Sequence, residues 1–138
     1  MTHESSAQLR EILSLDTIAV VGCSTTPGKA ARTVPKYMMA NGFEIIPINP
    51  TVDEVLGKPA YDSLANVEES IDIVNVFRPP NEIPQIVDAV LDRDDVCVLW
   101  LQQGIEHDEA ADRAREHGIT VVQDRCIRVE HRRLFNNK

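Results

Sequence analysis

Residues 17–29 read TIAVVGCSTTPGK, and this stretch decides the fold. An apolar run of strand type leads into a glycine-containing loop, and a helical pattern follows the loop. Gly22 lets the chain turn tightly and lets a ligand approach the backbone, while Ser24 and Thr25 offer hydroxyl groups. The helix after the loop directs free N–H groups and a positive dipole toward an anion. The stretch therefore predicts a phosphate-binding loop; the alternative is a tight turn whose serine only caps a helix.

Two basic residues follow this loop. Lys29 adds a mobile positive charge, and Arg32 stands about one helical turn further along. The loop is not a P-loop, because GKS or GKT is missing, and it is not a full GxGxxG, because Ser24 replaces the second glycine. We expect both cations to support binding of a phosphate group.

Short apolar runs alternate with amphipathic stretches along the chain, which is typical of a parallel sheet covered by helices. We predict an α/β fold: a Rossmann-like, doubly wound, five-stranded parallel sheet with helices on both faces. Right-handed crossovers and a reversal after the third strand predict the order 3-2-1-4-5. The predicted strands are Thr17–Val21, Glu44–Ile48, Asp72–Phe77, Val96–Leu101 and Thr120–Val122, and the predicted helices are Ser5–Leu13, Ala30–Ala40, Glu82–Leu91 and Asp108–His117. Residues 49–71 are expected to form a loop with at most a short helix.

Ligands of such sheets bind outside the carboxyl ends of the strands, so the loops at these ends are candidate binding elements. After the second strand, Asn49 offers hydrogen bonds to a sugar or base, and Pro50 stiffens the wall. After the fourth strand, Gln103 and Gly104 face the predicted cleft. Trp100, in that strand, is interpreted as a core residue.

The loop after the third strand contains Phe77, Arg78 and Pro79. A guanidinium matches phosphate geometry with two hydrogen bonds, and a proline-stiffened loop loses little entropy on binding. We therefore predict a ligand contact here. The alternative is that Arg78 pairs with a surface carboxylate, while the prolines start the next helix at Glu82.

An NAD(P)- or flavin-linked oxidoreductase of the same fold is the alternative function. Enzymes that use NAD usually place Asp or Glu at the end of the second strand to hold the ribose hydroxyls, whereas this chain has Asn49. No paired acid and base is recognisable, so the pattern disfavours this alternative.

Composition limits the remaining classes. The 138 residues are expected to form one domain, residues 1–138, and their formal net charge of −8 disfavours a nucleic-acid partner. No apolar run approaches the ~20 residues that cross a bilayer, and no secretory signal is evident. We therefore expect a cytoplasmic protein that contacts neither nucleic acid nor membrane.

The cysteines and histidines indicate neither a disulfide framework nor a metal site. His107 is interpreted as a cap of the helix that follows it. Cys126 follows the fifth strand beside Arg125 and Arg128, which favour a thiolate, so a redox role through Cys126 stays open as a second alternative. No nucleophile has an identifiable base, and we predict no catalytic residue.

In order and spacing, six segments resemble the stand-alone CoA-binding proteins related to the CoA-binding domain of the succinyl-CoA synthetase alpha subunit and of ADP-forming acyl-CoA synthetases. They are IAVVGCSTTPGK, GFEIIPINP, EVLGKPAYDSL, DIVNVFRPP, VLWLQQGI and GITVVQDRC. The likeness runs from about Thr17 to Phe135. It departs from the synthetases at Asp124-Arg125-Cys126, where those proteins have Pro-Asn-Cys, and it includes neither their phosphohistidine domain nor an ATP-grasp region.

The resemblance implies coenzyme A or acyl-CoA as the ligand, held by Gly22, Ser24, Lys29, Asn49, Pro50, Phe77, Arg78 and Pro79, with Gln103 and Gly104 nearer the reactive end. CoA presents a pyrophosphate and a ribose 3′-phosphate, which require scattered cations and not a ribose-binding carboxylate. We therefore expect a sensor, carrier or partner module that catalyses nothing by itself. A homodimer or a separate catalytic chain is the protein partner considered.

Overall fold

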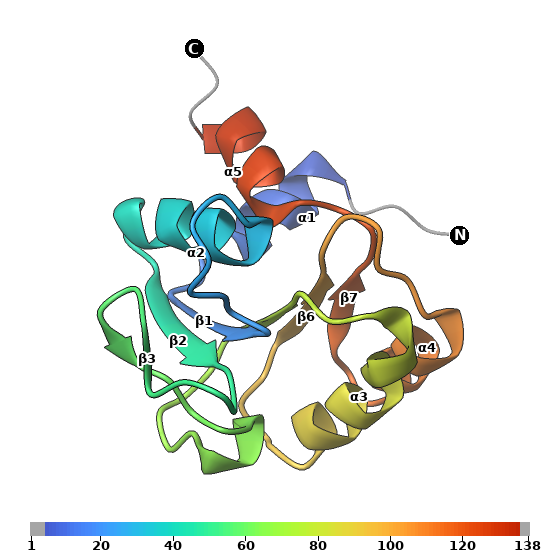
Figure 1. The fold of residues 1–138 in the computed structure, drawn as a ribbon. Coiled ribbons are helices and arrows are strands. Elements are labelled where there is room, and N and C mark those ends of the chain that lie inside the picture. Colours follow the sequence, from blue (N-terminus) through green and yellow to red (C-terminus); the bar gives the residue numbers. More distant parts are fainter. Residues whose placement is uncertain (1–4, 136–138) are drawn as a thin grey trace.

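The computed structural model describes residues 5–135 and contains a five-stranded parallel sheet (Figure 1). Its strands lie in the order β2-β1-β5-β6-β7 and are almost wholly buried, as expected for a sheet covered on both faces. The α/β class and the Rossmann-like architecture predicted from the sequence are confirmed. The strand bounds are β1 Thr17–Val21, β2 Glu44–Ile48, β5 Ile73–Val76, β6 Val98–Leu101 and β7 Thr120–Val122.

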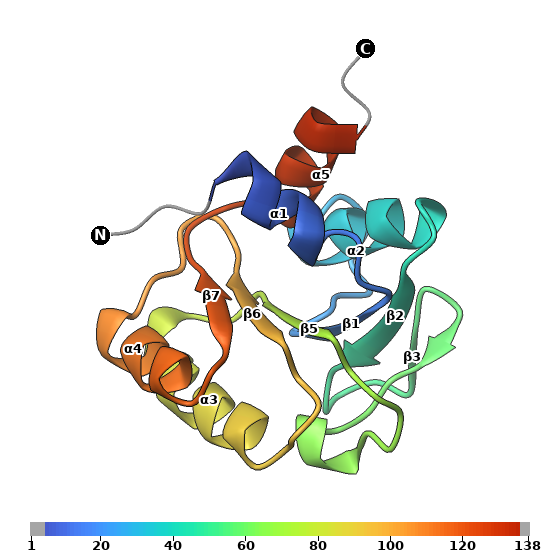
Figure 2. The same cartoon turned by 180° about the vertical axis from the view of Figure 1, so that it is seen from behind.

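Helices cover both faces of the sheet, as predicted (Figures 1 and 2). α3 (Ile83–Leu91) and α4 (Asp108–Glu116) pack on one face, where alternate strand residues such as Val74 and Leu99 form the core. α1 (Ser6–Ile12), α2 (Ala30–Ala40) and α5 (Ile127–Phe135) cover the other face.

Two helix starts are capped by side chains, and the cap at His107 was predicted from the sequence. The Ser5 side chain accepts a hydrogen bond from the backbone of Gln8, and His107 accepts one from the backbone of Ala110. The final helix, α5, was not predicted, although its buried residues Ile127 and His131 are four positions apart.

The predicted strand order needs a correction. Counted along the chain, the five strands lie in the order 2-1-3-4-5, because β5 pairs with β1 and not with β2. The outer edge of β2 is taken by Tyr61, which donates a backbone hydrogen bond to Pro47 and accepts one from Asn49. This single bridge lies where an outer third strand would lie in the doubly wound pattern. The order 3-2-1-4-5 therefore describes the sheet only if the bridge at Tyr61 is counted as the third strand.

Pro47 is the physical reason why β2 carries no full partner on this side. Its carbonyl faces Tyr61, and a proline has no N–H to donate toward the same side, so a continuous ladder there would lose a hydrogen bond. Proline within a strand is a signal of an edge position, and the sequence contained it.

The connection from β2 to β5 holds more structure than predicted. β3 (Glu54–Val55) and β4 (Lys58–Pro59) form a small antiparallel hairpin, and a 3₁₀ helix follows at η1 (Leu64–Asn66). The hairpin turn places Leu56 at φ 56° and Gly57 at φ 76°, the pair of positive values that a two-residue turn of type I′ requires. A second 3₁₀ turn, η2 (Pro80–Glu82), precedes α3.

Candidate ligand-binding cleft

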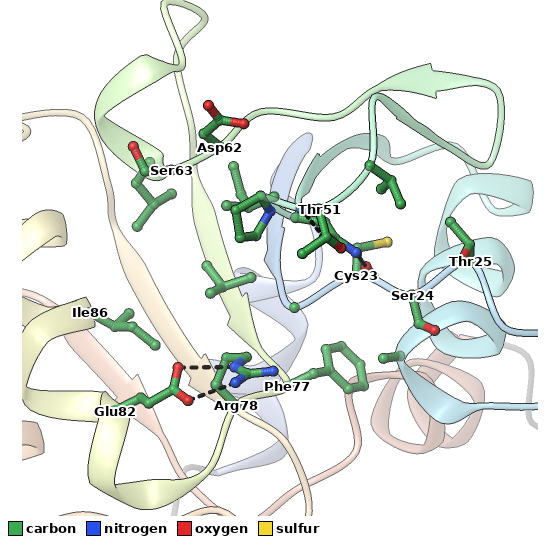
Figure 3. Close-up of a pocket in the computed structure, with 18 of the residues that line it drawn as sticks. Cys23, Ser24, Thr25, Thr51, Asp62, Ser63, Phe77, Arg78, Glu82 and Ile86 are labelled. Atoms are coloured by element: carbon green, nitrogen blue, oxygen red, sulfur yellow. Dashed lines mark hydrogen bonds and ion pairs between the residues drawn. The ribbon is translucent and has the colours of Figure 1, made fainter.

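A cleft of about 710 Å³ opens at the carboxyl ends of β1, β2 and β5 (Figure 3). This is the edge at which the sequence predicted a ligand site. Eight of the predicted site residues line the cleft: Gly22, Ser24, Thr25, Lys29, Asn49, Pro50, Phe77 and Arg78. The loops after three different strands thus meet around one space.

Gly22 lies where the first loop leaves β1 and has φ +89°, a backbone conformation that residues with a side chain rarely adopt. A Cβ atom at this position would lie 2.8 Å from Cδ of Arg78 and 3.2 Å from the carbonyl oxygen of Phe77. The glycine therefore serves two purposes: it allows the turn, and it lets the aliphatic part of Arg78 rest against the loop.

The rest of the first loop is held by its own hydrogen bonds. The Ser24 N–H donates to the carbonyl of Ala31, and the Ser24 hydroxyl accepts from the N–H of Thr26. This leaves the hydroxyl hydrogen of Ser24 for a ligand, because a hydroxyl group both accepts and donates.

The N-terminus of α2 adjoins the cleft through Ala31, which also lines it. Its N-cap residue, Lys29, makes no side-chain cap hydrogen bond, and the first turn contains no acidic residue. Lys29 is exposed and forms no ion pair within residues 5–135. The positive end of the helix and an available ammonium group therefore stand at the same side of the cleft.

Asn49 joins two loops of the cleft. Its Nδ2 donates to the carbonyl oxygen of Cys23 at 2.9 Å, and its Oδ1 accepts from both the N–H and the hydroxyl of Thr51. This side chain is engaged in building the site, and no carboxylate stands at the end of β2 where NAD-using enzymes hold the ribose.

Arg78 is oriented by a carboxylate that also lines the cleft. Its Nε donates to Oε1 of Glu82 at 3.0 Å and its Nη2 donates to Oε2 at 2.7 Å. These hydrogen bonds lower the pKa of the Glu82 carboxyl. The sequence presented ligand contact and carboxylate pairing of Arg78 as alternatives; the structure has Arg78 both in the cleft lining and paired.

The far wall was missed by the sequence analysis. Asp62, Ser63 and Leu64 line the cleft, and Figure 3 shows Asp62 and Ser63 on the opposite side from Ser24 and Thr25 of the first loop. Arg93 holds this wall in place, because its Nη1 donates to the carbonyls of Leu64 and Val67, both at 2.8 Å. The Asp-Ser turn before a short helix was the available signal, and it indicated a turn without indicating a cleft wall.

Four of the predicted site residues do not line the cleft: Arg32, Pro79, Gln103 and Gly104. Gln103 and Gly104 follow β6, which is separated from β1 by β5, and the N–H of Gly104 donates to the Asp124 carboxylate. Arg32 is half-buried on α2. Their contact with a ligand stays a prediction.

Cys126, the residue considered for a redox role, and Cys23 of the first loop have different surroundings. Cys23 lines the cleft but is fully buried, and this burial raises the pKa of its thiol to about 11. Cys126 packs against the core under α1, α2 and α5 and is not part of the cleft lining. The redox alternative therefore has no support from the position of either thiol.

No helix within residues 5–135 is long and apolar enough to span a bilayer. Over the same residues, no group of three or more His, Cys, Asp and Glu side chains is arranged to hold a metal ion.

These observations define a Rossmann-like domain with a cleft at the carboxyl edge of its sheet. The family model "CoA binding domain" matches residues 16–132. The uncharacterized protein YneT of Bacillus subtilis is 44% identical over 132 residues, which cover 95% of this chain and 97% of that protein. The chain belongs to the CoA-binding domain family.

The chain is also similar to part of a ligase and to a solved structure. The ADP-forming acetate–CoA ligase of Methanocaldococcus jannaschii is 31% identical over 81 residues, which are 59% of this chain but only 12% of the ligase. The crystal structure of Prb, the PH1109 protein redesigned for binding, superimposes with a TM-score of 0.95 at 32% identity, covering 100% of this chain and 97% of that one. The chain spans a small part of the ligase and nearly the whole of the stand-alone proteins.

Proposed function

We propose that this protein binds coenzyme A or an acyl-CoA in the cleft at the ends of β1, β2 and β5, as a module without catalytic activity of its own. The observation that carries the proposal is the convergence of the first loop, the start of α2 and two cations, Lys29 and Arg78, on one cleft. Membership of the CoA-binding domain family supports the same ligand.

The residues present fit the chemistry of CoA. Its phosphates require cations and N–H donors, which Lys29, Arg78 and the start of α2 supply. Its less polar parts require apolar walls, and Ile48, Val52 and Ile86 line the cleft beside the polar loops. A cleft of about 710 Å³ lies in the usual range for a small-molecule site.

We propose the absence of catalysis from the side chains that line the cleft. Cys23, the one thiol among the cleft-lining residues, is buried and has a raised pKa, which disfavours the nucleophilic thiolate. The match covers only 12% of the ligase relative, so the reaction of that longer protein does not carry over to this domain. We propose that the domain senses, stores or delivers the coenzyme, alone, as a homodimer or to a separate catalytic chain.

Isothermal titration with CoA, acetyl-CoA, NAD and NADP tests the proposal. We expect saturable binding of CoA that weakens about tenfold or more in Lys29→Ala and in Arg78→Ala, or about 1.4 kcal/mol each. Lys36→Ala is the matched control, because Lys36 is an exposed cation of α2 that does not line the cleft. Binding of NAD or NADP without a response to CoA would refute the proposal.

A further inference from the structure

The Arg78 guanidinium has two hydrogen-bonding edges, and Glu82 occupies only one. Nε and Nη2 donate to the two carboxylate oxygens of Glu82. Because the guanidinium is planar and trigonal, Nη1 then points directly away from this carboxylate. No residue within 5–135 accepts a hydrogen bond from Nη1, and Figure 3 shows this end of the side chain on the side of the cleft away from Glu82.

The other part of the side chain is held as well. Cδ and Cγ of Arg78 lie 2.8 and 3.4 Å from the position that a Cβ of Gly22 would occupy, so the stem rests against the first loop. A long arginine side chain otherwise loses considerable rotamer entropy when it binds an anion. Contact with the loop and pairing with Glu82 restrict it before any ligand arrives.

We propose that Glu82 is a positioning residue of the cleft, which holds Arg78 so that its second edge, at Nη1, faces the phosphate of the ligand. This inference rests on the proposed function, since it assigns Glu82 a role in binding the same CoA. Glu82 also brings a negative charge that opposes an anionic ligand, so positioning and charge act in opposite directions. A test must separate them.

Glu82→Gln and Glu82→Ala carry the same charge, but only glutamine retains an acceptor for the guanidinium. Glu82 is the N-cap residue of α3 but makes no side-chain cap hydrogen bond, so neither variant removes one. We expect Glu82→Gln to bind CoA about threefold to tenfold more tightly than Glu82→Ala. In the Arg78→Ala background this difference should disappear, because the residue that Glu82 positions is gone.

Asp62→Asn is the matched control for charge. Asp62 lines the same cleft, and no hydrogen bond joins it to Arg78, so this variant reports what loss of one negative charge does to CoA binding. In the ligand-free protein, the Nε–H NMR signal of Arg78 should exchange slowly with water in the wild type and in Glu82→Gln, and rapidly in Glu82→Ala.

Equal CoA affinities of Glu82→Gln and Glu82→Ala, or a difference that persists without Arg78, would overturn the positioning role while leaving CoA binding intact. Failure of the wild-type protein to bind CoA would overturn the proposed function, and this inference with it. The two failures are distinguished by the wild-type titration.

Discussion

The carboxamide of Asn49 and the carbonyl oxygen of Cys23 are joined by a hydrogen bond of 2.9 Å that ties the loop after β2 to the loop after β1. Both loops line the same cleft. The shape of this cleft therefore depends on contacts between segments 26 residues apart in the sequence, and several of these contacts lead to measurable expectations.

Replacement of Asn49 by alanine should lower the free energy of unfolding by about 1–2 kcal/mol, since the Cys23 carbonyl loses its donor and Thr51 loses its acceptor. Asn81→Ala is the matched control. Asn81 is exposed in η2, and its loss should change stability by about 0.5 kcal/mol or less. Urea denaturation measures both, and equal effects would show that the bridge contributes nothing.

Gly22→Ala should destabilise the fold more than Gly28→Ala. Both glycines have positive φ, +89° and +86°, so both substitutions introduce a strain of about 1–2 kcal/mol. A new Cβ at Gly22 additionally collides with Arg78, whereas nothing lies within 4 Å of one at Gly28. We expect the Gly22 variant to lose about 1 kcal/mol more. Matching unfolding curves for the two variants would contradict the close approach of Arg78.

Arg93→Ala should lower the free energy of unfolding by about 2–4 kcal/mol, because the side chain is largely buried and its loss leaves the Leu64 and Val67 carbonyls without this donor. Lys58→Ala is the comparison. The Lys58 pair with Glu44 is more exposed, and its loss should have an effect of about 1 kcal/mol or less. If Arg93→Ala proved as mild as Lys58→Ala, Arg93 would not be what holds the cleft wall.

Cys23 should resist alkylation in the folded protein. Burial raises the pKa of its thiol to about 11, so about one molecule in a thousand carries the thiolate at pH 8, and the sulfur is also shielded from the reagent. Cys97 is exposed and serves as the internal control. Mass spectrometry after brief iodoacetamide treatment should find Cys97 modified and Cys23 unmodified until urea is added; rapid labelling of native Cys23 would refute its burial.

The stability of the protein should fall as the pH drops below about 6.5, through His131. Burial among aromatic side chains lowers the pKa of this histidine in the folded state. The hydroxyl oxygen of Tyr37 lies 2.9 Å from its Nδ1. Between the ordinary and the lowered value the unfolded chain binds more protons, so acid favours unfolding, and the effect levels off below the lowered pKa.

His131→Phe should flatten this part of the dependence of the melting temperature on pH. His117→Gln is the control, because His117 is exposed at the end of α4 and its loss should leave the profile close to that of the wild type. If the melting temperature of His131→Phe fell with decreasing pH as steeply as that of the wild type, other groups would cause the acid sensitivity.

Much of the architecture was predictable because its signals are local. Runs rich in Val and Ile predicted the strands, and the bounds of β1, β2 and β7 agree with the prediction. β6 begins at Val98 and not at Val96, a small difference of the kind expected at strand ends, where pairing stops before the apolar pattern does. The first loop was recognisable because a strand, a glycine and a helix follow each other directly in the sequence.

The strand order and the pairing of Arg78 were harder to predict. Pro47 marks β2 as an edge strand, whereas the general pattern of doubly wound sheets predicts the third strand beside β2; in the structure β5 pairs with β1. Glu82 follows Arg78 by four residues, yet none of the residues between them is α-helical, so the spacing rule for α-helices did not apply.

The sequence by itself determined the α/β class, the glycine-containing loop after β1 and the family resemblance, because each depends on residues that are neighbours along the chain. Only the tertiary structure decided which loops share one cleft. The crossover from β2 to β5 brings Arg78 against Gly22 and Asp62 to the opposite wall, while Gln103 and Gly104 remain outside the cleft lining. Such distances depend on how strands pair across the sheet, and pairing between distant segments leaves no periodic pattern in the sequence.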